Sequence, residues 1–596
     1  MGVHKLDFYI NKTAPAGIKK EISIKEEIVD YCLTCDKEPL IVVDLTYFLC
    51  GGPSLSREEQ LCGGRANRFL HNVKSFFVGL RNLGARLAFF ANAYTKDEDF
   101  EQWIEKAEAR YQKEIAVLEY FYHGATLEDV TKFCLSNKIY VSLQKVTNQA
   151  VFEIARDQGR IFKMHNLPQA VATYANVNKA FAVLGNNSDY NIYGGEWRYW
   201  NAGRLFMRDM NVVQVEKRLL REHLGLTEDQ MPIFATMMGN HIIPEEAVKE
   251  FHEIIQSEVL VEKIASIISQ STDAVPTGDD TKIMMSLAFE DDFDQDLIRK
   301  SLKHYKTLPT FEVPKVSDNK LINQLYYESD LFSYQVLNEK VLYTSLQFVD
   351  LRKTDIPLYS ELALTLRRKC VGILVKNKPG GKHQQTFVIK TEHEEPFSMV
   401  KLDPIFPECL VPSLKDLFMP LILKTASLEY KMQRYDLLKF VISEKLTQPT
   451  IDSIPKQYLA TAVTIFYMFE NKCLTVDEAD IFTLSTYAAV MKKIPTKLAP
   501  PETLNHRAFR LTFMFLRLSE HIKRAFVICG LSQLVDETCF DGFHFHATYE
   551  KFMQQDFKQK EKMMSNTASY VQLYRTLNDL PTIGGLKKEK SSERKI

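Results

Sequence analysis

The alternation of short apolar runs with amphipathic segments over residues 38–210 constrains the fold more than any other feature of the chain. Apolar runs of strand length occur at 39–45, 85–91, 138–143, 181–185 and 204–207. Segments with helical periodicity lie between them, at 66–83, 97–118 and 148–158. Strands that alternate with helices form a mostly parallel sheet with helices on both faces. The sequence therefore predicts an N-terminal α/β domain.

The pattern after residue 210 becomes helical. Residues 215–223 predict a helix that ends at Gly225, and residues 231–255 predict two helices joined at Gly-Asn-His-Ile-Ile-Pro. A stretch rich in Ser, Thr, Asp, Pro and Gly follows at 269–282, and acidic residues come after it at 289–296. This composition indicates a linker region.

A second domain is predicted from the mixed pattern of the C-terminal half. Residues 370–376 and 385–390 predict the two strands of a hairpin, and residues 413–530 are strongly helical. The predicted fold is therefore α/β, with a helical region and a helix-rich α+β domain after the N-terminal domain. The predicted boundaries are 1–258 for the N-terminal domain, 259–304 for the helical and acidic linker region, 305–580 for the α+β domain and 581–596 for a disordered basic tail.

Composition narrows the class of protein. The chain is 45% hydrophobic and 25% charged, as is typical of globular proteins. The net charge of -1 means that any nucleic-acid surface must be local. No apolar run approaches the roughly 18 residues of a membrane span, and the N-terminus has no signal-peptide pattern. We expect an intracellular protein with no membrane partner.

The sequence contains one pair of cysteines and one pair of histidines that could bind a metal, but neither pair has the spacing of a complete metal site. Cys32 and Cys35 form a Cys-x-x-Cys pair in a predicted helix, but no second pair or nearby histidine completes it. His544 and His546 are interpreted as alternating solvent-facing residues of an edge strand. Neither group predicts a metal.

A cluster of small polar residues follows the apolar run Phe-Ala-Val-Leu-Gly at 181–185. It contains Asn187 and Asp189. In an open α/β sheet, ligands bind at the carboxyl ends of the strands, so this cluster indicates a site. A lone aspartate is nevertheless a poor site for a metal ion.

Five segments around this cluster resemble the flap endonuclease and XPG nuclease family in their order and spacing. They are Met-Gly-Val at the start, Ile-Val-Val-Asp44, Phe-Phe-Ala91, Asn187-Ser-Asp189 and Met-Met-Gly-Asn-His241. In that family, Asp and Glu side chains at these strand ends hold two divalent metal ions. Two hard cations roughly 4 Å apart need many oxygen ligands.

The resemblance also implies that most of these ligands have been lost. Asp44 and Asp189 remain, whereas Ala91, Asn187 and His241 stand at positions where the family has carboxylates. The family's paired glutamates, expected near 166–168, are absent, although Glu153 or Asp157 on the preceding helical segment could replace them. Two carboxylates cannot hold a two-metal cluster, so the resemblance implies a pseudo-nuclease without enzymatic activity, metal or cofactor. We expect His241 to be a neutral core histidine in the vacated space.

A narrower resemblance extends over nearly the whole chain. The sequence Met-Pro-Ile-Phe-Ala-Thr-Met-Met-Gly-Asn-His-Ile-Ile-Pro-Glu-Glu at 231–246 is very similar to the constitutive coactivator of PPAR-gamma family. So are Asp-Ile-Pro-Leu-Tyr at 355–359 and the N-terminal Met-Gly-Val-x-x-Leu-x-x-Tyr-Ile. This resemblance implies an RNA-associated adaptor or coregulator that works with protein partners in ribonucleoprotein or regulatory complexes. It also implies a cytoplasmic location, with some members in the nucleus.

Three basic segments are candidates for RNA binding, each with a structural alternative. The first, in the predicted helix at 97–118, alternates with acids that could pair with it. The second precedes a predicted edge strand, where lysines also prevent aggregation, and the third lies in the tail, where basic residues also aid solubility. The candidate residues are Lys96, Lys106 and Arg110 in the first segment, Arg367, Arg368 and Lys369 in the second, and Lys587 and Lys588 in the third.

Two other functions stay open from the sequence. One is a residual metal-dependent nuclease that uses Asp44 and Asp189. The other is a coregulator that binds only proteins and makes no nucleic-acid contact.

Overall fold

The structure is a computed structural model of the chain. It describes residues 2–49, 55–95, 99–137, 139, 148–255, 259–290, 293–327, 331–343, 346, 348–352, 354–376, 384–418, 428–495, 497–536 and 539–583. Across these residues, no helix combines the length and the apolar composition that a membrane span requires.

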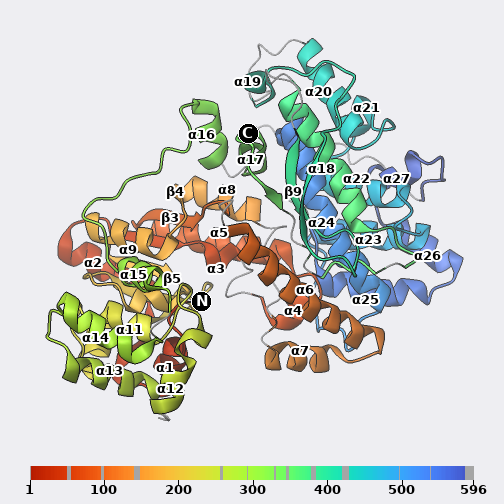
Figure 1. Cartoon of the computed structure of the whole chain (residues 1–596). Coiled ribbons are helices and arrows are strands. Elements are labelled where there is room, and N and C mark those ends of the chain that lie inside the picture. The colour runs from red at the N-terminus through yellow and green to blue at the C-terminus, as the bar shows by residue number, and fades with distance from the viewer. Residues whose placement is uncertain are drawn as a thin grey trace. The chain divides into compact units, whose positions relative to one another are not determined.

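The chain forms two compact units, each built from separated segments (Figure 1). Unit 1 comprises Met1–Ser54, His71–Tyr94 and Val151–Lys315, and unit 2 comprises Leu55–Leu70, Thr95–Ala150 and Val316–Ile596. Unit 1 therefore extends beyond the predicted boundary at residue 258.

A seven-stranded sheet organises unit 1, with the strand order β1-β7-β6-β5-β2-β3-β4. The five strands from β6 to β4 are parallel, whereas β7 and β1 continue the sheet in antiparallel pairings. This confirms the mostly parallel sheet. The strands are β1 (Lys19–Ser23), β2 (Leu40–Asp44), β3 (Arg86–Asn92), β4 (Gly159–Met164), β5 (Ala182–Gly185), β6 (Arg198–Phe206) and β7 (Asn211–Val215).

Helices cover both faces of this sheet because successive side chains of a strand point to opposite sides. On β3, the ring of Phe89 lies 4.9 Å from that of Phe77 on α5 (Ala66–Asn82). The next residue, Phe90, lies 5.2 Å from Tyr174 on α9 (Leu167–Val177). The other helices with residues in unit 1 are α1 (Leu6–Lys12), α2 (Ile24–Cys35), α3 (Thr46–Leu49), α8 (Asn148–Gln158), α10 (Lys217–Leu224), α11 (Met231–Met237), α12 (Lys249–Ile255), α13 (Leu260–Ser271), α14 (Gly278–Ala288) and α15 (Gln295–His304).

The strand predictions for unit 1 are confirmed where the apolar runs are continuous. The runs at 39–45, 85–91 and 181–185 match β2, β3 and β5, and 204–207 overlaps the end of β6. The sequence did not predict β1, β4 or β7, in which charged or polar residues interrupt the apolar pattern. Most of the predicted strand at 138–143 lies outside the described residues.

The helix predictions after the sheet are also confirmed. Helix α10 ends at Gly225, which adopts the left-handed conformation (φ 66°) that glycine tolerates best. Helices α11 and α12 flank the Gly-Asn-His-Ile-Ile-Pro segment, as expected.

The predicted linker region at 259–304 is instead part of the core of unit 1. Helices α13, α14 and α15 bury apolar residues in the same cluster as α11 and the sheet, among them Ile264, Met284 and Ile298. In Figure 1, α11, α13 and α14 lie together with α1 and α12. The polar residues that indicated a linker fall in the short loop between α13 and α14 and in the first turn of α14, where Thr277 caps the helix.

Unit 2 is mainly helical and contains a three-stranded sheet of order β10-β9-β8. This confirms the helix-rich α+β prediction. Its central helix is α24 (His506–Ile528), which packs against α18 (Tyr359–Val375) and α22 (Lys456–Glu470). Its other elements are α4 (Arg57–Leu61), α6 (Phe100–Tyr122), α7 (Leu127–Ser136), α16 (Lys320–Tyr327), α17 (Leu331–Leu337), β8 (Leu342–Tyr343), β9 (Gln385–Ile389), β10 (Ser398–Leu402), α19 (Leu414–Leu417), α20 (Leu428–Val441), α21 (Gln448–Asp452), α23 (Val476–Val490), α25 (Gly542–Met553), α26 (Phe557–Met564) and α27 (Leu573–Thr576).

The prediction of a strand at 370–376 is wrong, because this segment completes helix α18. Its valines and isoleucine favour a strand locally, yet the segment is buried on all sides in the helical core. The second predicted strand, 385–390, is confirmed as β9, but its antiparallel partner is β10. The turn at 377–382 lies outside the described residues.

The prediction of an edge strand with solvent-facing histidines at 544 and 546 is also wrong. These residues lie on helix α25, where the Asp541 side chain caps the first turn by accepting from the His544 backbone N–H. His546 is buried, and His544 Nδ1 lies 3.2 Å from Ser485 Oγ. Asp541 is the N-cap of this helix and Gly542 its first residue.

Burial makes the stability of unit 2 depend on the protonation of His546. It lowers the pKa of this imidazole from 6.5 to about 3. The folded state thus disfavours the protonated form, so the stabilisation is complete above pH 6.5 and is lost as pH falls toward 3. We predict that the free energy of unfolding of the unmodified chain falls by more than that of His546→Leu when the pH is lowered from about 8 to about 4.5. The difference between the two decreases should be about 2–3 kcal/mol, because leucine cannot titrate.

Urea unfolding at the two pH values, followed by helical circular dichroism, measures this difference. His123→Leu is the matched control, because the His123 side chain is 73% exposed. An equal pH dependence for His546→Leu and the unmodified chain would contradict the prediction.

Candidate functional site

The carboxyl ends of the central parallel strands of unit 1 meet at one edge of the sheet. Strand β2 ends at Asp44, which pairs with Phe90 of β3, and Ala91 follows Phe90. On the other side of β2, strand β5 ends at Gly185, two residues before Asn187. The structure therefore brings Asp44, Ala91 and Asn187, three of the positions predicted from the resemblance, to one edge, where ligands bind in open α/β sheets.

Both carboxylate oxygens of Asp44 accept hydrogen bonds within the fold. Asp44 is 4% exposed, and its Oδ2 accepts a hydrogen bond from the Tyr190 hydroxyl at 2.7 Å. Its Oδ1 accepts from the Thr46 N–H at 2.9 Å. Burial raises the pKa of Asp44, against the opposing effect of these two donors. Both carboxylate oxygens thus stabilise the strand end and the turn after it.

The next two positions offer no carboxylate to a metal. Ala91 is buried on β3, beside Lys163 of β4 in the strand register. Asn187 caps the short 3-10 helix Ser188–Asn191, because its Oδ1 accepts from the Asp189 N–H at 3.0 Å. Glu153 and Asp157, the possible replacements, are exposed on α8.

Asp189 is the most deeply buried acid at this edge, with no exposed surface. Its Oδ1 accepts a hydrogen bond from the Tyr305 hydroxyl at 2.8 Å. Its Oδ2 faces two imidazoles, His304 Nε2 at 3.7 Å and His241 Nδ1 at 3.8 Å. Burial alone would raise the pKa of Asp189, but the His304, His241 and Tyr305 groups hold it below its ordinary value.

The two imidazoles differ in their exposure. His304, the last residue of α15, is 3% exposed, and its backbone carbonyl accepts from the Tyr193 hydroxyl at 2.8 Å. The His241 side chain is 42% exposed, so the expectation of a core histidine is wrong. His241 lies at the surface of the site with one face toward His304, their ring centroids being 4.6 Å apart.

The loop that carries His241 is held in place from both sides. Asn240 Oδ1 accepts from the backbone N–H groups of Ile242 and Ile243, and its Nδ2 donates to Ser301 on α15 at 2.8 Å. The His4 N–H donates to the carbonyl of Gly239, whose φ of 78° strongly favours glycine. The Gly-Asn-His sequence thus fixes His241 relative to α15.

Taken together, these groups do not fit a pair of magnesium ions. Such a pair needs many oxygen ligands, yet Asp44 is satisfied within the fold and Ala91 and Asn187 supply no carboxylate. Among the described residues, one group of at least three His, Cys, Asp or Glu side chains could hold a metal, and it consists of Asp189, His241 and His304. Its ligand atoms lie within 4.8 Å of one another.

Sequence reasoning missed His304, Tyr305 and Tyr190. Tyr305 lies 116 residues after its partner Asp189, so no local spacing connects them. Tyr190 directly follows Asp189, and this position just after a strand is the sequence feature that could have identified it as a site residue. His304 lies in a segment that was interpreted as a linker, where a single histidine has no predicted neighbour.

The predicted RNA-binding residues have different surroundings. Lys106 and Arg110 are exposed on α6. Arg367 is 3% exposed, and its guanidinium lies 5.0 Å from the Phe387 ring, so it cannot belong to a surface patch. Arg368 donates to the Asp403 carbonyl and Lys369 to the Val441 carbonyl. A helix separates three consecutive side chains by about 100° each, which explains why the predicted patch does not form.

The remaining predicted positions, Lys96, Lys587 and Lys588, lie outside the described residues.

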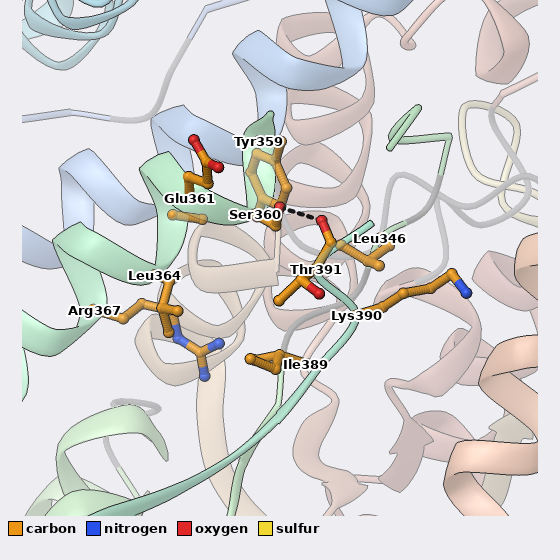
Figure 2. A pocket seen from close by; sticks show the side chains of 10 residues that line it. Leu346, Tyr359, Ser360, Glu361, Leu364, Arg367, Ile389, Lys390 and Thr391 are labelled. Carbon is orange, nitrogen blue, oxygen red and sulfur yellow. Dashed lines mark hydrogen bonds between the residues drawn. The ribbon is translucent and has the colours of Figure 1, made fainter. Parts of the chain in front are cut away.

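A pocket in unit 2 lies between helix α18 and strand β9 (Figure 2). Its lining combines aliphatic side chains such as Leu364 and Ile389 with the buried Arg367. The Ser360 hydroxyl donates to the Thr391 carbonyl at 2.7 Å across the pocket, and the Tyr359 hydroxyl is paired with His521 Nε2 at 2.9 Å. The hydroxyls of Ser360 and Tyr359 at this pocket are therefore bonded within the fold.

The contact between Asp44 and Tyr190 predicts a loss of stability when the hydroxyl is removed. Tyr190→Phe takes one donor from a buried carboxylate, which should lower the free energy of unfolding by about 1–3 kcal/mol. Chemical denaturation measures this loss, with Tyr174→Phe as the control, since its hydroxyl lies outside the Asp44 contacts. Equal stability of Tyr190→Phe and the control would show that the hydrogen bond does not fix Asp44.

Comparison with known proteins places this site in a family context. Residues 224–308 match the FAM120A-like domain, a segment that contains both His241 and His304. The human constitutive coactivator of peroxisome proliferator-activated receptor gamma is 23% identical over 253 residues, which cover 42% of this chain and 27% of the relative. Mouse constitutive coactivator of PPAR-gamma-like protein 2 is 24% identical over 210 residues, covering 33% of this chain and 18% of the relative.

The matched region thus spans less than a third of each of these relatives. Among solved structures, human GEN1 in complex with Holliday junction DNA matches 68% of this chain and 88% of that chain, at 13% identity and a TM-score of 0.32. The chain carries a FAM120A-like domain and is related in sequence to the constitutive coactivators of PPAR-gamma, which confirms the narrower resemblance.

Proposed function

We propose that the chain is a pseudo-nuclease that acts as an RNA-associated coregulator, binding RNA and protein partners without cutting nucleic acid. The observation that carries the proposal is the state of Asp44. Asp44 lies at the end of the central strand, where a nuclease of this type would hold metal. Its two carboxylate oxygens instead accept hydrogen bonds from Tyr190 and Thr46.

The loss of catalysis is supported by the rest of the sheet edge. Ala91 has no ligand atom in its side chain, and Asn187 is engaged as the cap of the helix that begins at Ser188. A two-metal reaction needs both ions to stabilise the attacking and leaving oxygens of the phosphate. Without the carboxylates that hold these ions, the edge lacks the means to activate water for hydrolysis by that route.

The coregulator role is supported by the relatives. The matched human and mouse proteins are named as constitutive coactivators, and the FAM120A-like domain contains the loop and helix that complete the Asp189 cluster. Coactivators work through protein partners, so we extend that role to this chain.

The RNA role is supported by the arrangement of charges on α6. Lys106, Arg110 and Lys113 are exposed and recur every three or four residues, so they fall within about 60° on the helix surface. Glu101 and Glu105 lie about 80–180° from each of these cations around the axis, whereas Glu114, about 40° from Arg110, is buried. The three cations therefore form a stripe, named here the α6 stripe.

A stripe of this kind suits the RNA backbone. Phosphate contacts from Lys and Arg supply most of the affinity of sequence-independent binding and make it depend on salt. Such binding needs no metal ion, so a chain without the catalytic carboxylates can retain it.

Charge reversal on the α6 stripe tests the RNA role. We predict that the triple variant Lys106→Glu, Arg110→Glu, Lys113→Glu binds single-stranded RNA at least about ten-fold more weakly at low salt. The slope of log affinity against log salt should also fall by about 2, since each lost phosphate contact removes about 0.7. Fluorescence anisotropy with labelled single-stranded RNA over a salt titration measures both quantities.

The matched control reverses three exposed lysines on α25 and α26, Lys551, Lys558 and Lys562, and so changes the net charge equally. Equal loss in both triple variants would reject the α6 stripe as the binding surface. Negligible RNA binding by the unmodified chain at low salt would instead favour a coregulator that binds only proteins.

A further inference from the structure

Two buried polar atoms at the sheet edge have no hydrogen-bond partner. They are Asp189 Oδ2 and His304 Nε2, which belong to side chains with 0% and 2% exposure. Leaving such groups unsatisfied in a protein interior costs free energy. The two atoms point toward each other across 3.7 Å, a separation too long for a hydrogen bond.

A third donor completes the arrangement. His241 Nδ1 lies 3.8 Å from the same Asp189 oxygen, and all three ligand atoms fall within 4.8 Å of one another. Around a tetrahedral zinc ion with bonds of about 2.0–2.2 Å, ligand atoms are separated by about 3.3–3.5 Å. The two distances from Asp189 Oδ2 exceed these separations by only a few tenths of an ångström, and side-chain movements of about 1 Å would bring all three ligand atoms to them.

We propose that Asp189, His241 and His304 form a binding site for one transition-metal ion of the zinc type. This inference does not depend on the proposed RNA role, because it concerns a different unit of the chain and a different ligand.

The donor set determines the class of ion. Imidazole nitrogen suits zinc and its neighbours in the first transition row, whereas magnesium prefers oxygen donors. A site with two imidazoles and one carboxylate therefore selects against the magnesium that a flap nuclease would use.

Surrounding groups hold the ligands in the required orientation. The Tyr305 hydroxyl donates to Asp189 Oδ1 at 2.8 Å, so the carboxylate presents Oδ2 to the two imidazoles. Tyr193 donates to the backbone carbonyl of His304, and Asn240 joins the His241 loop to Ser301 on α15. Hydrogen bonds of this kind around a metal site fix ligand geometry and raise affinity.

The exposure of the ligands also suits an ion that enters from solvent. Asp189 and His304 are buried, whereas the His241 side chain is 42% exposed. An ion could therefore reach the buried pair past His241, and a water molecule could complete a tetrahedral set on the open side. The role of the ion would be to join the loop after α11 to α15 and the sheet edge.

The test uses the full chain, stripped of metal with a chelator that is then removed. We expect cobalt(II), a spectroscopic substitute for zinc, to bind with about one equivalent and to give the intense visible bands of a tetrahedral site. Zinc should displace the cobalt and abolish these bands, while excess magnesium should not. Isothermal titration calorimetry with zinc gives the affinity.

Variants connect the signal to this site. His241→Ala should preserve the fold, because the side chain is partly exposed, and should weaken zinc binding by at least about 100-fold, the upper end of the loss caused by outer-shell changes. Asp189→Asn should also remove the tetrahedral cobalt spectrum. The matched control is His223→Ala, because His223 Nε2 lies 3.2 Å from Glu262 in the same unit without a second imidazole in the pair.

The results that support the metal site differ from those that contradict it. Stoichiometric cobalt binding that is lost in His241→Ala but kept in His223→Ala supports the site. Absence of a tetrahedral spectrum in the unmodified chain, or zinc affinity that is equal in His241→Ala and His223→Ala, overturns it. RNA affinity measured on the same stripped protein reports on the proposed function separately, since the α6 stripe contains none of the three ligands.

Discussion

The buried carboxylate of Asp189 is the interaction on which the arrangement of unit 1 depends. A charge with no exposed surface must be compensated by nearby donors or charges, because its removal from water is costly. Here the compensation comes from residues far apart in the sequence: Tyr305 donates to one oxygen, and His241 and His304 face the other. The Asp189 carboxylate thereby connects three parts of unit 1: the end of strand β5, the loop after α11 and the end of α15.

Asp44 has a structural role at the end of the central strand. Each of its carboxylate oxygens accepts a hydrogen bond within the fold, one from a tyrosine hydroxyl and the other from a backbone N–H. The parallel strands place Asp44 opposite Phe90 and Val43 opposite Leu184. The side chains near this edge include an alanine, a capping asparagine and two imidazoles, which are not the oxygen ligands that hard cations need.

Much of the fold could be predicted from the sequence because continuous apolar runs such as β2 and β5 are buried on both faces. The failures have specific physical causes. The run at 370–376 has the composition of a strand but lies within a helix, since tertiary burial outweighs local propensity. Arg367 is charged, yet it is buried between aromatic rings. The absence of carboxylates at positions 91, 187 and 241 could be read from the sequence. The pairing of His304 with Asp189 could not, because it arises only from tertiary contact.

One measurement decides whether this edge of the sheet supports cleavage of nucleic acid. Purified full-length chain would be incubated with labelled single-stranded and hairpin RNA in magnesium or manganese, and the products separated on a denaturing gel. We predict that every strand stays intact, because Asp44 is committed to Tyr190 and Thr46 and the other oxygen ligands are missing. Metal-dependent cleavage that disappears in Asp44→Ala would contradict this account and identify the chain as a nuclease.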